Sequence, residues 1–227
     1  MVISGLVAHW TLLETSGLQD SVGSTCTFNL DSRASTSSDG VVCPVFSGSL
    51  GCAKCDYTSS SNLPTANTAR TMMFWMKMAS NSNDATGIAG YGTTGSKKPF
   101  LASLRSGKKL TWELWGPTIS DSNIAPVADE YTHIALTYDG SQNGQFFKGG
   151  VASPTTMSSG GDLITPSSGS VVIGGEIDNN EGMTGTIKDL RIYDRVLSAS
   201  EIASIIAGNI LINLLHNTFF YKINMEL

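Results

Sequence analysis

The chain has 227 residues and a formal net charge of −5; 41% of its residues are hydrophobic and only 15% are charged. A disordered chain would combine low hydrophobicity with high net charge, and a protein that binds nucleic acid through phosphate contacts would normally be basic. The composition therefore predicts an all-β globular protein with many polar turns, and it argues against nucleic acid as a partner.

Short runs in which apolar and polar residues alternate predict antiparallel strands with one buried face. In chain order these runs are 6–12, 71–78, 109–114, 133–138, 144–148, 170–174 and 186–193. The segments between them are rich in Gly, Ser, Asn and Asp and are predicted as loops, namely 80–98, 116–129, 139–144, 158–169 and 176–182. Because no long helical period interrupts the runs, we expect an all-β fold, an antiparallel two-sheet β-sandwich of the jelly-roll type.

A short helix is predicted after the last strand. Ser198 with Glu201 three residues later forms a capping box, and Ile202, Ile205 and Ile206 follow at helical spacing. We therefore place the domain at residues 1–206.

The remaining tail, residues 207–227, is almost free of charge. Its Asn209, Asn213 and Asn217 recur every four residues and would give a helix a polar stripe, which a lone membrane-spanning helix tolerates poorly. We expect an amphipathic helix that packs against the sandwich or a protein partner. Membrane association and a disordered appendage are the alternatives.

Four cysteines fall early in the chain, at positions 26, 43, 52 and 55. Cys52 and Cys55 form a C-x-x-C motif, but no second close pair exists to complete a zinc ribbon. Cys43 and Cys55 flank a predicted hairpin, so we expect them to form a disulfide, although four cysteines allow three pairings and plain buried thiols remain an alternative.

The order of the segments resembles the laminin-G-like, concanavalin A-like jelly-roll domains. The matching stretches are GLVAHWTLLETSGLQDSVGS, FSGSLGCAKCDYTSS, TMMFWMKM, YTHIALTYDGS, SGSVVIGG and GMTGTIKDLRIYDRVLSASEI, which cover about residues 5–206. The resemblance implies binding of glycans or protein surfaces in many relatives and catalysis in some, and the fold alone does not decide between them. One departure is Phe147-Lys148-Gly149-Gly150, where the family often has Tyr-x-Asp-Gly.

The segment Glu176-Ile177-Asp178-Asn179-Asn180-Glu181 resembles the E-I-D-x-x-E signature of the retaining β-glucanases in this superfamily. In those enzymes the carboxylates project from one strand face into a cleft, and retaining chemistry needs the two key carboxyl groups close together. Here Asn179 and Asn180 occupy positions that are normally apolar. We therefore predict a solvated acidic turn and no enzyme; a retaining glucan hydrolase that uses Glu176, Asp178 and Glu181 is the alternative.

Calcium is the one cofactor that the sequence suggests, because jelly rolls of this type often hold a structural ion and calcium prefers oxygen ligands in loops. Asp20, in the turn before Gly23, and Asp189, on the last strand, are the expected ligands, with Asp178 and Asn179 as an alternative at the rim. The competing interpretation is that these side chains cap their own turns.

Exposed aromatic residues beside polar groups suit sugars, since C–H faces stack on rings while hydroxyls find hydrogen-bond partners. Trp112 and Trp115 are three apart, so one should be buried and the other exposed or at a strand end. Trp115 and Tyr91 are the predicted stacking residues. Asp178, Asn179 and Asn180 are the predicted polar contacts, while Trp10, Trp75 and Trp112 are expected in the core.

Together these patterns predict a non-catalytic, lectin-like module for adhesion or recognition that binds a glycan or glycoprotein. A protein–protein assembly module without sugar affinity is the main alternative. The three histidines are far apart in sequence, so we expect none of them to be catalytic. We expect an extracellular or surface location, although no Lys or Arg precedes the short apolar run at the start of the chain, as it would in a signal peptide.

Overall fold

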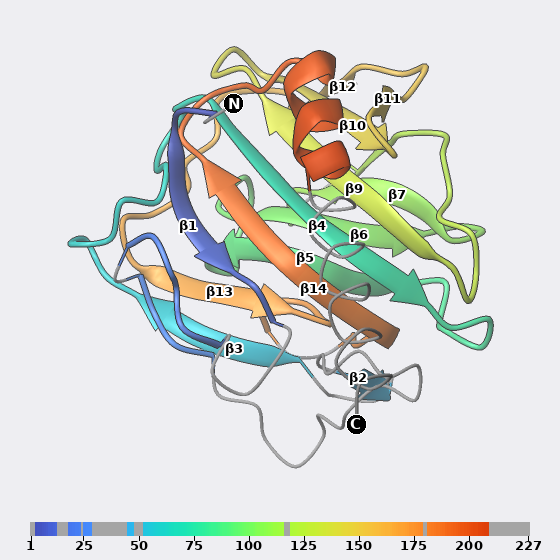
Figure 1. The fold of residues 1–227 in the computed structure, drawn as a ribbon. Helices are drawn as coiled ribbons and strands as arrows, with labels where there is room; N and C mark the ends of the chain where they lie inside the picture. Colours follow the sequence, from blue (N-terminus) through green and yellow to red (C-terminus); the bar gives the residue numbers. More distant parts are fainter. Residues whose placement is uncertain are drawn as a thin grey trace, which may run out of the picture.

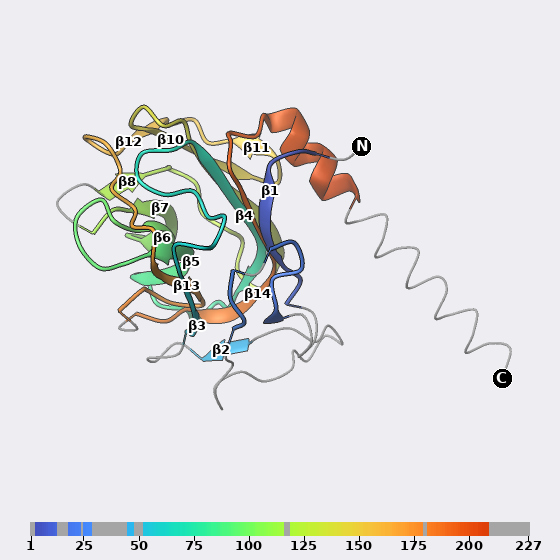
Figure 2. The ribbon, with the colours of Figure 1, turned by 90° about the vertical axis from the view of Figure 1, so that its left-hand side faces the viewer.

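The computed structural model describes residues 3–12, 18–23, 25–28, 45–47, 52–115, 119–178 and 181–208. Within these residues, strands form two antiparallel sheets that stack face to face, as Figures 1 and 2 show. The predicted all-β sandwich is therefore confirmed.

The larger sheet, the eight-stranded sheet, runs in the order β1-β14-β4-β9-β10-β11, and β2 and β12 add to its sides by pairing with β14 and β10. Its strands are β1 (Leu6–Trp10), β2 (Val45–Ser47), β4 (Arg70–Met78), β9 (Tyr131–Tyr138), β10 (Asn143–Lys148), β11 (Val151–Ala152), β12 (Met157–Ser158) and β14 (Thr184–Tyr193). The six-stranded sheet runs in the order β3-β13-β5-β6-β7-β8. Its strands are β3 (Ala53–Tyr57), β5 (Thr86–Gly92), β6 (Phe100–Arg105), β7 (Lys109–Glu113), β8 (Ile119–Asp121) and β13 (Gly169–Ile173).

The hydrophobic core lies between the two sheets. Alternation along each strand points one set of side chains inward, and Trp10, Phe74, Trp112 and Phe146 are fully buried there. The indole of Trp112 packs edge-on against Phe100, with ring centroids 6.1 Å apart. Burial of each such large side chain contributes roughly 1.5–3 kcal/mol, so this layer is the main source of stability.

A fully buried arginine, Arg70, sits at one end of this core. Its guanidinium stacks 5.5 Å from the ring centroid of Phe100. The described hydrogen-bond acceptors are neutral oxygens, the carbonyls of Pro64, Thr65, Ala66 and Thr68 and the side chains of Thr68, Tyr91 and Thr165. The buried charge is thus satisfied by the chain that leads into β4, and it fixes the course of that segment.

The strand β5 lies within a segment that the sequence predicts as a loop, 80–98, so that prediction is wrong there. Gly87 and Gly90 interrupt its alternation, but both are needed because other backbone passes close to them. A Cβ on Gly90 would lie 2.6 Å from the Cα of Leu101 on the neighbouring strand. The glycines therefore mark close packing rather than a turn.

The hairpin predicted around Cys43 and Cys55 is also wrong. β2 pairs with β14 in the eight-stranded sheet, whereas β3, which carries Cys55, pairs with β13 in the six-stranded sheet. Cys55 instead forms a disulfide with Cys26, with their Cα atoms 5.6 Å apart. Cys43 lies outside the described residues. Cys55 points into the core layer, where Cys26 packs against the same cluster, and this brings the two sulfurs together.

The predicted C-terminal helix is confirmed and spans residues 199–208. The capping box is formed: the Ser198 N–H donates to Glu201 at 2.9 Å, and the Glu201 N–H donates to the Ser198 hydroxyl at 3.3 Å. Ile202 and Ile205 pack on the outer face of the eight-stranded sheet (Figure 2). No helix in the described part of the chain is long and apolar enough to cross a membrane. The predictions for residues 209–227 lie outside the described residues.

The stretch Phe147-Lys148-Gly149-Gly150 lacks the acidic residue that the laminin-G-like family often has there, but it still forms a tight hairpin. Lys148 pairs with Val151 across Gly149 and Gly150. Both glycines have positive φ, 58° and 85°, as a two-residue type I′ turn requires. The two glycines therefore form this turn without an acidic residue.

Candidate functional site

The candidate site lies on the outer face of the six-stranded sheet. Along β6, Phe100, Ala102 and Leu104 face the core, so alternation points Arg105 outward. On β7, Glu113 pairs with Leu101, another outward residue of β6. An arginine and a glutamate of neighbouring strands thereby share one face.

The segment that follows β13 folds back over this face. The Lys54 ammonium donates to the carbonyl of Ile177 at 2.7 Å, and the Ile177 side chain packs on Leu101 and Val172. The Gly87 N–H donates to the carbonyl of Glu181 at 3.2 Å. Residues 174–178 and 181–183, which we call the return segment, therefore carry Glu176 and Glu181 to the ends of β5 and β6.

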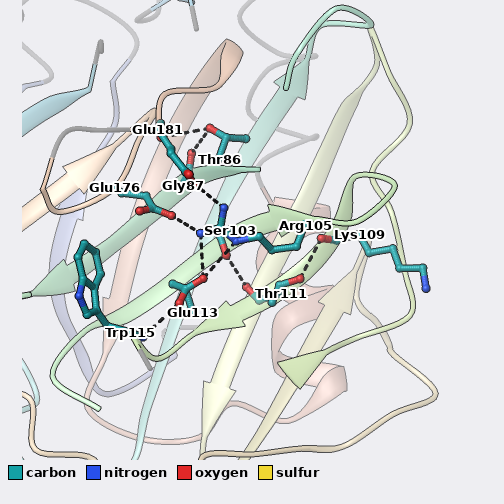
Figure 3. A network of polar contacts seen from close by, with 10 residues as sticks. All are labelled: Thr86, Gly87, Ser103, Arg105, Lys109, Thr111, Glu113, Trp115, Glu176 and Glu181. Carbon is teal, nitrogen blue, oxygen red and sulfur yellow. Dashed lines mark hydrogen bonds and ion pairs between the residues drawn. The ribbon is translucent and has the colours of Figure 1, made fainter. Parts of the chain in front are cut away.

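Three glutamates converge on Arg105, as Figure 3 shows. One guanidinium nitrogen, Nη2, contacts Glu113 Oε2 at 3.0 Å and Glu176 Oε1 at 2.5 Å. The other, Nη1, donates to Glu181. We call Arg105, Glu113, Glu176 and Glu181 the acid cluster.

The acid cluster carries more negative than positive charge. The side chains of Glu113 and Glu176 are only 8% and 7% exposed, whereas that of Glu181 is 40% exposed. Burial raises the pKa of Glu176 to about 7, and the neighbouring glutamates and Asp178 add to this while Arg105 opposes it. One guanidinium cannot neutralise three carboxylates, so Glu176 takes up a proton at higher pH than an ordinary glutamate does.

Trp115 is tied to the acid cluster through its backbone. Its N–H donates to Glu113 Oε1 at 3.1 Å, and its φ is 51°, in the left-handed region that residues with a side chain seldom adopt. The indole is half-buried and lies just beyond the end of β7 (Figure 3). Glu113 therefore links the ion pair to the backbone of Trp115 and holds a strained backbone in place.

Of the predicted contact residues, Trp115 lies beside the acid cluster, which also contains Glu176 and Glu181 of the alternative hydrolase prediction. Asp178 lies on the same return segment and is half-buried, while Asn179 and Asn180 lie outside the described residues. The prediction of a solvated acidic turn is wrong for Glu176, because Arg105 and the return segment bury it.

Two predictions about aromatic residues need correction. Tyr91 is fully buried in β5, where its hydroxyl donates to the carbonyl of Pro64 at 2.8 Å, so it cannot stack on a sugar. Trp75, expected in the core, is half-buried on the outer face of the eight-stranded sheet. Trp10 and Trp112 are in the core as predicted.

The residues predicted to bind calcium are engaged with protein groups. Asp20 accepts the backbone N–H groups of His9, Val22 and Thr25, the pattern of a capped turn. Asp189 accepts from His9 Nε2 at 2.7 Å and from Arg191 Nε at 2.9 Å. Among the residues that the structure describes, no group of three or more His, Cys, Asp and Glu side chains could hold a metal ion. Calcium binding stays a prediction.

His9 therefore lies between both predicted calcium ligands, a contact that the sequence did not indicate. The Ser21 hydroxyl is 3.3 Å from His9 Nδ1 and 3.1 Å from the His9 carbonyl oxygen, to which it donates. Because Arg191 shares the carboxylate of Asp189, this group is a structural network that joins β1 to β14.

Comparison with known proteins gives one family and several similar structures. The family model described as "Concanavalin A-like lectin/glucanases superfamily" matches residues 53–203. The binding domain of botulinum neurotoxin serotype D is 14% identical with a TM-score of 0.67, and the match covers 91% of this chain and 51% of that one. Domain 4 of AbnA, an extracellular GH43 arabinanase from Geobacillus stearothermophilus, is 16% identical with a TM-score of 0.57, over 88% of this chain and 97% of that one.

A third similar structure, Trypanosoma rangeli sialidase, is 17% identical with a TM-score of 0.64; the match covers 89% of this chain and 32% of that one. The chain thus spans about half of the neurotoxin domain and less of the sialidase. At sequence identities of 14–17%, the similarity to these three structures shows the fold of this chain. A search of curated proteins finds no match.

Proposed function

We propose that this chain, which belongs to the concanavalin A-like lectin/glucanases superfamily, binds carbohydrate without cleaving it, at Trp115 and the acid cluster. The observation that carries the proposal is the hydrogen bond from the Trp115 backbone N–H to Glu113, which holds the backbone of a residue with a partly exposed indole next to the acid cluster. A sugar ring can stack its C–H face on the indole.

The carboxylates supply the polar half of such a site. Glu181 is the most exposed member of the acid cluster and has a second oxygen that can accept a sugar hydroxyl. Its position is set by Arg105 and by the Gly87 N–H on its carbonyl. A preformed acceptor loses little entropy on binding, so a rigid cluster at the edge of the indole favours hydroxyl-rich ligands.

Cleavage is disfavoured by what the buried carboxylates contact. A retaining glycosidase needs two carboxyl groups that flank the scissile bond. Here Glu113 and Glu176 are both buried and both contact one guanidinium nitrogen of Arg105. Glu176 also follows β13 rather than lying on it, so it does not line a strand face with Asp178 and Glu181. These features support a binding role.

The relatives support the same proposal. The arabinanase domain, of which the match covers 97%, is described in complex with arabinotriose. An extracellular location fits the Cys26–Cys55 disulfide, because disulfides persist in oxidising compartments. We therefore favour a secreted or surface-displayed sugar-binding module, with adhesion as its role.

A glycan array probed with wild-type protein and with Trp115→Ala tests the proposal. We expect wild type to bind neutral oligosaccharides and Trp115→Ala to lose them, while the control Val151→Ala, at an exposed apolar residue of the eight-stranded sheet, retains them. An array on which wild type binds no sugar would overturn the proposal and leave protein–protein assembly. Release of reducing ends from β-glucans by wild type, abolished in Glu176→Gln, would overturn the non-catalytic part. The same array with calcium and with a chelator tests the calcium prediction.

A further inference from the structure

The acid cluster carries more negative charge than its arginine balances. Within the described residues, the carboxylates of Glu113, Glu176 and Glu181 all contact the guanidinium of Arg105. The excess remains when Glu176 is protonated, because two ionised carboxylates then share one cation. The cluster therefore presents a negative potential on the face where we propose that sugar binds.

Charged groups next to the cluster leave this excess in place. Lys54 lies on β3, and its ammonium donates to a backbone carbonyl of the return segment at 2.7 Å. Burial raises the pKa of Glu176, and Asp178 is one of the carboxylates that raise it further. Lys54 and Asp178 have opposite charges, so together they do not change the balance. The undescribed residues that adjoin the site along the chain, 116–118 and 179–180, have no ionisable side chain.

Two carboxylate oxygens of the cluster remain available to a ligand. Arg105 contacts Glu176 through Oε1 and Glu181 through Oε2. In the described part of the chain, no hydrogen bond reaches Glu176 Oε2 or Glu181 Oε1. Glu176 is only 5% exposed, and in Figure 3 its second oxygen points away from Arg105. An acceptor in a nearly buried side chain is costly to leave without a donor, so a ligand that brings a donor gains affinity here.

Trp115 adds an aromatic group that also favours a cation. Its backbone N–H donates to Glu113 Oε1 at 3.1 Å, and its side chain is half-buried just beyond β7. In Figure 3 the indole lies on the same side of the network as Glu176. The face of an indole attracts an ammonium group more strongly than the ring of tyrosine or phenylalanine does. The aromatic residue and the carboxylates therefore favour a ligand of the same charge.

We propose that the acid cluster makes this site selective for sugars that carry an amino group, as oligomers of glucosamine do. The inference rests on the proposed function, since it names the ligand class of the same site. The sugar ammonium donates to Glu181, whose side chain is 40% exposed, and supplies the positive charge that Arg105 alone does not. Sugar acids are excluded, because a further carboxylate would be repelled by the cluster.

The ligand class follows from the combination of charge, donors and ring. A neutral sugar can stack on the indole but leaves the excess negative charge in place. A lysine side chain supplies the charge but has no saturated ring to stack. An amino sugar supplies both, because its ring presents C–H groups and its ammonium has three N–H donors for carboxylate oxygens.

Calorimetric titration with a matched series of hexasaccharides tests the inference. Cellohexaose, the N-acetylglucosamine hexamer and the glucosamine hexamer share one β-linked backbone. They differ at the second carbon of each ring, which carries a hydroxyl, an acetamide or, at mildly acidic pH, an ammonium. We expect wild type to bind the glucosamine hexamer at least about fivefold more tightly than cellohexaose, with a preference that weakens with added salt. The acetamide has the nitrogen without the charge and should not produce this preference.

Three variants locate the preference. Glu181→Gln keeps an oxygen that can accept from Arg105 but removes the charge, so the ratio of glucosamine-hexamer affinity to cellohexaose affinity should fall about fivefold. The control Glu130→Gln changes the net charge equally at an exposed residue outside the cluster and should retain the wild-type ratio. Trp115→Ala should weaken binding of both hexamers, which attraction by charge alone would not cause. Thermal unfolding of each variant shows whether it is folded before its affinity is compared.

Three results would overturn the inference. The first is a glucosamine hexamer that binds wild type no more tightly than cellohexaose does, or not at all. The second is an equal fall of the affinity ratio in Glu181→Gln and Glu130→Gln. The third is binding of oligolysine that is as tight and depends on Glu181 and Trp115, which would assign the cluster to basic proteins. Failure of the proposed function is distinguishable, since it shows as an absence of sugar binding on the array.

Discussion

Glu176 offers the sharpest test of the acid cluster, because its charge should destabilise the fold. Its side chain is 7% exposed, and it shares Arg105 with two other glutamates. Glu176→Gln keeps the size and an oxygen that accepts from Arg105, while it removes the negative charge. We therefore expect the variant to be more stable than wild type above neutral pH.

The size of the effect follows from the pKa. The folded state raises the pKa of Glu176 from the ordinary 4.5 to about 7. The folded state then binds more protons than the unfolded state between these values, so stability is present below pH 4.5 and is lost as pH rises through 7. At 1.36 kcal/mol per pKa unit, the ionised side chain costs at most about 3 kcal/mol at pH 8. Glu176→Gln should recover about 1–3 kcal/mol at pH 8 and close to nothing at pH 4.5.

Urea denaturation at a series of pH values measures this directly. Wild type should lose stability between pH 4.5 and 7, and the profile of Glu176→Gln should be flatter. Glu130→Gln, at an exposed acidic residue, should follow wild type within about 0.5 kcal/mol. If Glu176→Gln gained nothing at pH 8 and retained the wild-type slope, then Arg105 would suffice for all three carboxylates and the reasoning would fail.

Three further changes test other parts of the structure. Arg70→Met should cost about 3–5 kcal/mol in urea denaturation, since it leaves buried carbonyls without donors; a loss below about 1 kcal/mol would contradict the role of Arg70. Gly87→Ala should lower the free energy of unfolding by about 2 kcal/mol and weaken sugar binding, because its Cβ would meet the backbone of Gly175 at 2.3 Å. The control Gly208→Ala, with open space around it, should leave the free energy of unfolding unchanged. Equal effects of the two substitutions would refute the close packing at Gly87. Without reductant, Cys26→Ser should have a free energy of unfolding about 3 kcal/mol below that of wild type, and a reducing agent should lower wild type to the value of the variant. If Cys26→Ser were as stable as wild type without reductant, the result would argue against the disulfide.

Local patterns in the sequence predicted local structure well. The strands with strict alternation, such as β4, β9 and β14, appear where the apolar period placed them. The capping box of Ser198 and Glu201 also formed, since both of its hydrogen bonds join residues three apart. β5 was missed because Gly87 and Gly90 leave no alternation to detect, although they are needed where other chain segments pass closely.

The sites depend on pairings that no local pattern contains. Glu176 and Glu181 stood out in the sequence, but Arg105 and Glu113 join them only through the register of β6 and β7 and the fold-back of the return segment. The cysteine pairing failed for a related reason, because β2 and β3 go to different sheets.

Calorimetric titration of a neutral oligosaccharide selected on the array, into wild type and Trp115→Ala, tests the central claim most directly. Loss of a stacking contact of about 1.4 kcal/mol weakens affinity about tenfold, and we predict at least this loss in Trp115→Ala with Val151→Ala unchanged. Wild-type affinity in Trp115→Ala would contradict the assignment of sugar binding to the face that carries the acid cluster.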